Sequence, residues 1–272
     1  MAKKQPKKST RVSGWITSSP LQEMDVVYPT RPGDDNDELC LSIRSLIHFP
    51  HRGLWVTGHK PGWLAECGHI PDIGGATKEA RLYNSVLAAA NHPDVSEKFV
   101  LFNDDFFVTA PMTTLPTWYL KPLRAHCEEP QIQNGLAADW GESMLYTLEL
   151  LESLGVKRPL SYELHYPMIF DKKKLAEIMT PYVGDHPPQL RSLYGNLAGI
   201  GGTRRMDAKA HGVVNQQRPI ITPLMSTNDD SIAEYRDRLH RMFPDPSRYE
   251  AGFIERVQQL QAAVVPPQAY RR

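Results

Sequence analysis

The first 110 residues alternate between strand-like and helix-like segments, and this order constrains the fold more than any other feature of the chain. Residues 24–29, 53–58 and 98–108 are short apolar runs with many β-branched and aromatic side chains. Residues 37–49 and 77–92, which lie between them, repeat apolar side chains at helical spacing. Strands that alternate with helices favour parallel pairing. The order therefore predicts an α/β fold with a mostly parallel, Rossmann-like sheet flanked by helices.

The starts of the two helices carry residues that cap helices. Asn36 or Asp37 precedes the apolar residues of 37–49, and Thr77 precedes those of 77–92. Side-chain oxygens at such positions accept hydrogen bonds from the first backbone N–H groups of a helix.

The chain after Pro111 is richer in helical patterns. Residues 160–170 are strand-like around His165, and residues 218–231 indicate a strand and a turn. These segments are expected to complete the sheet and to form a C-terminal helical lobe. Further helices are expected at residues 142–155, 171–182 (capped by Asp171), 189–202, 231–243 and 249–264.

Composition excludes several classes of protein. The 31 basic and 31 acidic residues balance, so no global charge attracts nucleic acid or an anionic membrane. The three cysteines are widely spaced, which argues against a disulfide framework and favours a reducing, cytoplasmic location. No apolar run is long enough to span a membrane. Residues 1–20 form a basic segment that is expected to be a disordered tail.

Two adjacent carboxylates, Asp104 and Asp105, lie within the third strand-like run, at or just past the end of its apolar stretch 99–102. Ligands of parallel sheets bind beyond the carboxyl ends of the strands, where the loops after the first two strands also open. Adjacent carboxylates there can hold Mn²⁺ or Mg²⁺, which in turn can hold a substrate diphosphate. Neighbouring side chains on a strand point to opposite faces, so we expect Asp105 to bind the metal directly, with Asp104 beside it.

The helix before this strand carries Lys78 and Arg81 on one face, with Asn84 close by. A basic helix that leads into a strand with a terminal acidic motif resembles the glycosyltransferases of the GT-A fold. That resemblance implies a GT-A-like sheet, a nucleotide-sugar donor bound by the basic helix, and a metal bound by the acidic pair.

A second resemblance covers about two thirds of the chain. In order and spacing, four segments of the chain are similar to the conserved segments of the Stealth family, which comprises capsular-polysaccharide and N-acetylglucosamine phosphotransferases. The segments are 25–35, 37–64, 96–107 and 162–175. This resemblance suggests a bacterial or phage origin. In its first motif the family has an Asp where this chain has Pro32. This departure favours ordinary glycosyl transfer over sugar-phosphate transfer. The matching positions are Asp25, Glu38, Arg44, Pro61, Trp63, Leu64, Asn103, Asp104, Asp105, His165 and Pro167.

Roles follow for individual residues. His165 could complete the metal shell, with His211 as a rival ligand, and an imidazole ligand would favour manganese. An inverting transferase needs a carboxylate base, for which Asp139 and Glu163 are the candidates. The nucleotide-sugar is expected to contact Asp25, Arg31, Asp34, Thr57, Lys78, Arg81, Asn84, Asn103 and Arg204.

The sequence thus predicts a metal-dependent glycosyltransferase that moves a sugar from a nucleotide-sugar to a hydroxyl of a glycan, a protein or modified DNA. A Stealth-like hexose-1-phosphate transferase and a non-catalytic carbohydrate- or nucleotide-binding module are the alternatives. The protein is expected in the cytoplasm, or in the host cytoplasm if it is viral, and its oligomeric state stays open. One catalytic domain is expected over 21–250, with a donor half (21–112) and an acceptor half (113–250), followed by a helix and tail over 251–272.

Overall fold

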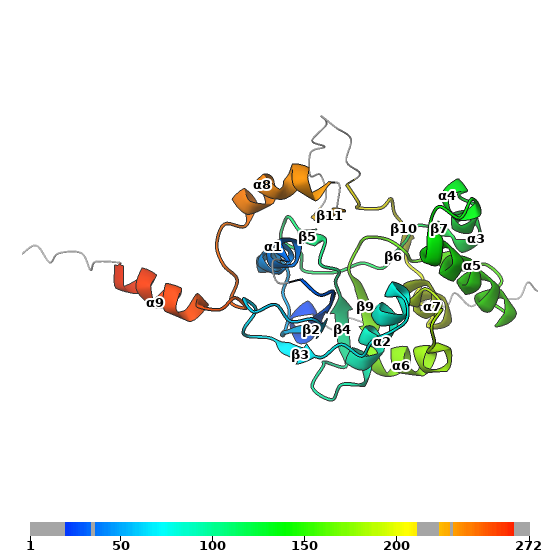
Figure 1. Ribbon diagram of the computed structural model, residues 1–272, viewed down its shortest axis with the longest axis horizontal. Helices are drawn as coiled ribbons and strands as arrows, with labels where there is room; N and C mark the ends of the chain where they lie inside the picture. The colour runs from blue at the N-terminus through cyan, green and yellow to red at the C-terminus, as the bar shows by residue number, and fades with distance from the viewer. Residues whose placement is uncertain (1–19, 34–35, 211–222, 229–230, 264–272) are drawn as a thin grey trace, which may run out of the picture.

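A five-stranded sheet forms the centre of the computed structural model, which describes residues 20–33, 36–210, 223–228 and 231–263 (Figure 1). Its strand order is β3-β2-β1-β4-β9, in which the first four strands are parallel and β9 is antiparallel to β4. The mostly parallel α/β sheet predicted from the sequence is confirmed, although β3 was not foreseen. The strands are β1 (Asp25–Thr30), β2 (Leu54–Gly58), β3 (Gly68–Ile70), β4 (Lys98–Leu101) and β9 (Met168–Asp171).

Both faces of the sheet are covered. Val26 and Tyr28 of β1 pack into one core, and Val27 between them packs into the other. Helix α1 (Asp37–Ser45) contributes to the first core and α2 (Lys78–Asn91) to the second. Because successive side chains of a strand point to opposite faces, a strand buried on both sides is continuously apolar.

The predicted helix starts are confirmed. The side chain of Asn36 accepts a hydrogen bond from Leu39 N at the start of α1, and Thr77 accepts one from Ala80 N at the start of α2. Asp171 caps α6 (Lys172–Met179) in the same way.

The predicted continuous strand over 98–108 is wrong. Strand β4 ends at Leu101, and the chain turns before β5 (Phe106–Val108), which pairs antiparallel with β11 (Leu224–Ser226) outside the central sheet. A hydrogen bond from Phe106 N to Asn103 O closes this turn. The acidic pair therefore lies in a turn, where the alternation of a regular strand does not apply.

The strand-like stretch 160–170 also divides. Only β8 (Leu160–Ser161) and β9 are strands, and His165 lies in the irregular segment between them. Strand β8 pairs with β7 (Lys121–Pro122) rather than with the central sheet.

The second half of the chain supplies the remaining helices, and the predicted ones are present with shifted ends. A separate apolar core joins α3, α4, α5 and α7 into a helical group beside the sheet (Figure 1). Helix α8 packs on α1, and α9 projects from the body. These elements are α3 (Leu123–Cys127), α4 (Pro130–Gln133), α5 (Ala138–Ser153), α7 (Leu190–Leu197), α8 (Ile232–Met242) and α9 (Phe253–Ala263). The short elements are η1 (Leu21–Glu23), η2 (Leu46–His48), η3 (Thr180–Tyr182), β6 (Trp118–Tyr119) and β10 (Thr203–Arg204).

Within the described residues, no helix has both the length and the apolar character that crossing a membrane requires. The predicted basic tail falls almost wholly outside the described residues. The division into donor and acceptor halves stays a prediction.

Candidate functional site

A cleft of about 830 Å³ lies at the carboxyl ends of β1, β2 and β4. Residues that follow these strands line it, together with Glu38 of α1, Asp72 and the first turns of α2. Three residues from the second half of the chain, His165, Lys209 and Asn228, also line it. The convergence of strand-end loops predicted from the parallel order is therefore present in the structure. The cleft-lining residues used below are Arg31, Glu38, Thr77, Lys78, Arg81, Asn103, Asp104, Asp105, His165 and Lys209.

Asp104 and Asp105, called the floor of the cleft below, both line it but have different environments. Asp104 accepts a hydrogen bond from Asn36 Nδ2 (3.3 Å), and its Oδ2 lies 4.0 Å from Arg31 Nε. Asp105 Oδ2 accepts one from Ser226 Oγ (2.8 Å), but its buried Oδ1 has no hydrogen-bond partner among the described residues.

The electrostatics of Asp105 reflect this incomplete solvation. Burial raises the pKa of Asp105 above its usual value, and Asp104 adds to the effect. The charge of His165 and the hydrogen bond from Ser226 oppose the shift without cancelling it. A buried carboxylate with an unused oxygen is therefore available at the edge of the sheet.

Glu38 adds a third carboxylate to the cleft. Its Oε1 accepts a hydrogen bond from Thr227 Oγ1 (3.0 Å), and its Oε2 lies 3.8 Å from Arg31 Nη2. Burial raises the pKa of Glu38 as well, and Asp104 and Asp105 act in the same direction. Sequence reasoning gave Glu38 no role at the site, although it was one of the positions that match the Stealth segments.

Asp104 and Asp105 alone would not complete the coordination of a divalent cation, so a bound substrate would have to supply further ligands. Among the described residues, no three His, Cys, Asp or Glu side chains converge well enough to hold a metal ion. The unused Oδ1 of Asp105 fits a cation, and Asp104 lies beside it. Mg²⁺ in proteins is commonly held by one or two carboxylates, with substrate phosphates and water as the other ligands. The donor set of Asp104 and Asp105 matches that pattern.

His165 lies at the cleft, but the structure does not place it in a metal-binding group. Its Nδ1 is 2.7 Å from Asp207 Oδ2, and its Nε2 is 3.2 Å from Lys209 Nζ. Both ring nitrogens are therefore engaged by protein groups. The rival ligand, His211, and the predicted nucleotide contact Asp34 lie outside the described residues.

The start of α2 provides the basic wall of the cleft. Thr77, Lys78 and Arg81 line it, and Arg81 Nη1 pairs with Asp72 Oδ2 at 3.0 Å. Asn84, predicted to join them, instead donates to Gly74 O and is not a cleft-lining residue. The free N–H groups and the dipole of a helix N-terminus favour anions.

Three other predicted binding residues are not among those that line the cleft. Asp25 starts β1 at the opposite edge of the sheet, where it accepts hydrogen bonds from Arg52, Trp55 and Ser96. Thr57 is buried within β2, and its carbonyl accepts from Thr30. Arg204 is exposed on β10 and donates to Leu120 O.

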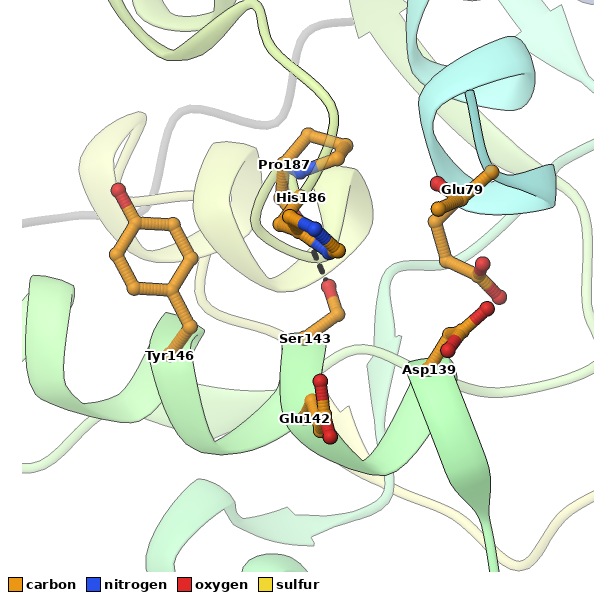
Figure 2. A pocket seen from close by; sticks show the side chains of 8 residues that line it. Glu79, Asp139, Glu142, Ser143, Tyr146, His186 and Pro187 are labelled. Atoms are coloured by element: carbon orange, nitrogen blue, oxygen red, sulfur yellow. Dashed lines mark hydrogen bonds between the residues drawn. The ribbon is translucent and has the colours of Figure 1, made fainter. Parts of the chain in front are cut away.

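Neither predicted catalytic base lines the cleft. Asp139 borders a separate cavity of about 170 Å³ between α2 and α5, where its carboxylate faces that of Glu79 (Figure 2). Glu163 accepts hydrogen bonds from the backbone N and the Oγ of Ser192, at 3.0 and 2.8 Å. Burial raises the pKa of Glu163, although Arg191 and Ser192 oppose the shift.

Sequence reasoning missed Asp207, Lys209 and Ser226. Lys209 forms an isolated parallel β-bridge with Ser226, and Ser226 in turn donates to Asp105. No local motif marks these residues, because their positions depend on pairing between β5 and β11. The strand-like pattern of 218–231 was the only signal near them.

Comparisons with known proteins give no family assignment. No protein-family model matches the chain, and no curated protein matches it. Membership of the Stealth family is therefore not shown.

Two solved structures that do match are of LgtC. One is a crystal structure of an LgtC active-site mutant, with 12% identity and a TM-score of 0.42, covering 80% of this chain and 95% of that chain. The other is galactosyltransferase LgtC in complex with donor and acceptor sugar analogs, with 11% identity and a TM-score of 0.43, covering 85% and 99%. These values are too low for transferring a function, so we infer function from the residues of the cleft.

Proposed function

We propose that this protein is a metal-dependent glycosyltransferase that uses a nucleotide-sugar donor. The observation that carries the proposal is the pairing of opposite charges across one cleft. Asp104 and Asp105, with its unused Oδ1, form the floor, and the basic start of α2 forms a wall. A bound cation on the floor and a diphosphate against the wall would satisfy both sets of charges.

The charges explain why the ligand should contain both a cation and phosphate. Asp104, Asp105 and Glu38 together would repel a phosphate, because like charges in a partly buried site are costly. A divalent cation held by Asp104 and Asp105 would remove that repulsion and would supply positive charge to stabilise a diphosphate leaving group. Lys78 and Arg31 would bind the phosphate oxygens, and Asn103 would contact the sugar.

The acceptor is proposed to be a hydroxyl of a glycan, a protein or modified nucleic acid. A cytoplasmic site of action is part of the proposal, since the three cysteines are free in the structure and fit a reducing compartment.

A Stealth-like hexose-1-phosphate transferase is the second candidate, favoured by the similar segments around Asp25, Asn103 and His165. Pro32 lines the cleft at the position where that family has an Asp. Glycosyl transfer releases a nucleoside diphosphate, whereas sugar-phosphate transfer releases a nucleoside monophosphate. The two reactions can therefore be told apart by their nucleotide product.

The first test is a thermal-shift screen of UDP-, GDP- and dTDP-sugars, with and without Mn²⁺. A ligand present at 100 times its Kd should stabilise the fold by about 2.7 kcal/mol. We expect one nucleotide class to raise the midpoint in Mn²⁺ and to lose most of its effect in EDTA. No shift from any nucleotide-sugar would contradict the proposal.

The second test identifies the products that form with the active donor. A nucleoside diphosphate supports glycosyl transfer, and a monophosphate would support the alternative. Binding without turnover would indicate a non-catalytic binding module. Asp105→Asn should abolish the Mn²⁺-dependent shift, while Asp139→Asn, at the separate cavity, is the matched control and should retain it.

A further inference from the structure

His165 and Asp207 form a hydrogen-bonded pair whose geometry is fixed from two sides. Asp207 Oδ2 lies 2.7 Å from the ring Nδ1, and Asp207 Oδ1 accepts from the backbone N of His165 at 2.9 Å. The same Oδ1 accepts from Lys209 N at 3.3 Å. Burial alone would raise the pKa of Asp207, but the hydrogen bonds and charge of His165 outweigh it and the pKa lies below the usual value. Asp207 is therefore a carboxylate that orients the ring.

The neighbours of the ring determine which nitrogen carries the proton. A lysine ammonium can only donate, so Lys209 Nζ, at 3.2 Å, donates to Nε2 and the lone pair of Nε2 must accept. Nδ1 then carries the proton and donates it to Asp207. In the neutral ring, these contacts leave the basic nitrogen, Nε2, on the side of Lys209.

The side chains of His165 and Lys209, which meet at this nitrogen, both belong to residues that line the cleft. His165, Lys209 and Asp105 all line the cleft, and the charges of His165 and Lys209 both act on Asp105. The two carboxylates that the sequence suggested as bases, Asp139 and Glu163, do not line it. Among the described residues, His165 is thus the cleft-lining side chain with a basic nitrogen and a dedicated orienting carboxylate.

Building on the proposed glycosyl transfer, we propose that His165 is the catalytic base for the acceptor hydroxyl, that Asp207 positions it, and that Lys209 covers its lone pair until the donor arrives. The diphosphate of the donor would attract the Lys209 ammonium, which then leaves Nε2. The base would become available only when a donor is present.

The proposed step balances as follows. The acceptor oxygen forms a bond to the anomeric carbon as the bond from that carbon to the diphosphate oxygen breaks. The hydroxyl proton passes to His165 Nε2, the bonding electrons of the broken bond leave with the nucleoside diphosphate, and the imidazolium is stabilised by Asp207. A single displacement of this kind inverts the anomeric configuration.

The first experiment follows hydrolysis of the donor found in the screen, with water as the acceptor. His165→Gly should lower kcat by about 10²-fold or more, the usual contribution of a general base. Added imidazole should restore a large part of the rate, which it would not do for a structural residue. Asp207→Asn should lower kcat with little change in KM. His186→Gly, at the separate cavity, is the control and should keep the wild-type rate.

His165→Gln covers the case in which His165→Gly does not fold, because glutamine can keep the hydrogen bond to Asp207 but is not a base. Proton NMR of the released sugar, read before mutarotation, should show the inverted anomer. Retained configuration, an unchanged rate in His165→Gln, or failure of imidazole to restore His165→Gly would each overturn the role of His165 while leaving glycosyl transfer in place.

The second experiment does not depend on turnover. Diethylpyrocarbonate modifies neutral imidazole nitrogen, and peptide mass spectrometry measures its rate at His165. Lys209→Met should raise that rate several-fold over wild type, whereas Lys173→Met, an exposed lysine on α6, should not. Equal rates in Lys209→Met and wild type would overturn the covering role of Lys209. Absence of any donor hydrolysis by the wild-type protein would instead overturn the proposed function, and with it the catalytic role of His165.

Discussion

At the scale of single residues, Asp25 and Asp105 show how differently two buried aspartates can be used. Asp25 is 1% exposed, and its two oxygens accept from the Arg52 guanidinium, Trp55 Nε1 and Ser96 N. Within the described ranges, Asp105 has one hydroxyl donor, Ser226, for its two oxygens. A satisfied buried carboxylate stabilises the fold, while an unsatisfied one costs stability and is available for a ligand.

Asp105→Asn should stabilise the ligand-free protein near pH 7 by roughly 1 kcal/mol, because it removes a poorly solvated charge. The pKa of Asp105 is raised in the folded state. Protonated Asp105 therefore contributes its full stabilisation of the wild-type fold below the pKa of aspartate in the unfolded chain. This stabilisation is lost as the pH rises through the pKa of Asp105 in the folded protein. We expect the stability difference between variant and wild type to grow with pH across that window.

Urea unfolding between pH 4 and pH 8 measures this difference. Asp245→Asn, at an exposed aspartate, controls for the loss of one negative charge. A destabilised Asp105→Asn at neutral pH would show that Asp105 is a structural residue.

Asp25→Ala should have the opposite effect and destabilise the protein by about 3 kcal/mol or more, since it leaves several buried donors unpaired. The donor affinity of the remaining folded protein should be unchanged, because Asp25 lies at the edge of the sheet away from the cleft. Chemical denaturation and nucleotide-sugar titration of one preparation separate the two effects. Weaker donor binding with unchanged stability would instead support the nucleotide-sugar contact that the sequence predicted for Asp25.

At the scale of elements, the start of α2 combines two functions. Thr77 caps the helix through Ala80 N, and its hydroxyl also donates to Asp185 O at 2.9 Å. The same turn carries Lys78 and forms a wall of the cleft. The Thr77 side chain therefore stabilises the start of α2, contacts the second half of the chain and lies beside the proposed phosphate site.

Thr77→Ala should destabilise the protein by about 1 kcal/mol, the usual cost of losing a helix cap. The melting temperature should fall by about 2–4 °C for a chain of this size, and donor affinity should fall as well. Thr77→Ser keeps the hydroxyl and should restore both. Ser153→Ala, at the exposed end of α5, is a control for losing a hydroxyl and should change little.

At the scale of the whole molecule, Glu250 contacts residues from the first quarter of the chain. Glu250 forms two hydrogen bonds to the Arg44 guanidinium, at 2.8 and 2.7 Å, and forms an isolated bridge with Leu64. Helix α9 begins three residues later, and Ile254 on it is 59% exposed. The folded body thus depends on Glu250 more than on the helix that follows.

A chain that ends at Gly252 should unfold in one transition, with a melting temperature within about 2 °C of the full chain, because Ile254, Glu255 and Arg256 at the start of α9 are exposed. Glu250→Ala should cost about 2 kcal/mol, because it leaves the half-buried Arg44 guanidinium without its carboxylate. Calorimetry of both variants checks this. A large loss of stability on truncation alone would show that α9 belongs to the folded core.

Local patterns predicted the part of the structure that depends on local chemistry. The caps at Asn36, Thr77 and Asp171 were recognised because each cap bonds within three residues of itself. The run 98–108 was misread because its apolar residues continue past Leu101, although the backbone turns at Asn103. The pairing of β5 with β11, which lies more than 100 residues away, is what ends the sheet strand there.

The sequence by itself determined the parallel sheet and the location of Asp104 and Asp105 at its edge, because hydrophobic period, strand–helix order and capping residues act over short distances. Only the tertiary structure decided which charged groups have partners. Asp25 is paired with Arg52, Trp55 and Ser96, whereas one oxygen of Asp105 has no hydrogen-bond partner in the part of the chain that the structure describes. The His165–Asp207 pair likewise joins residues that are 42 positions apart. The cost or use of a buried charge depends on the groups that packing brings around it, and side-chain spacing along the chain does not specify those groups.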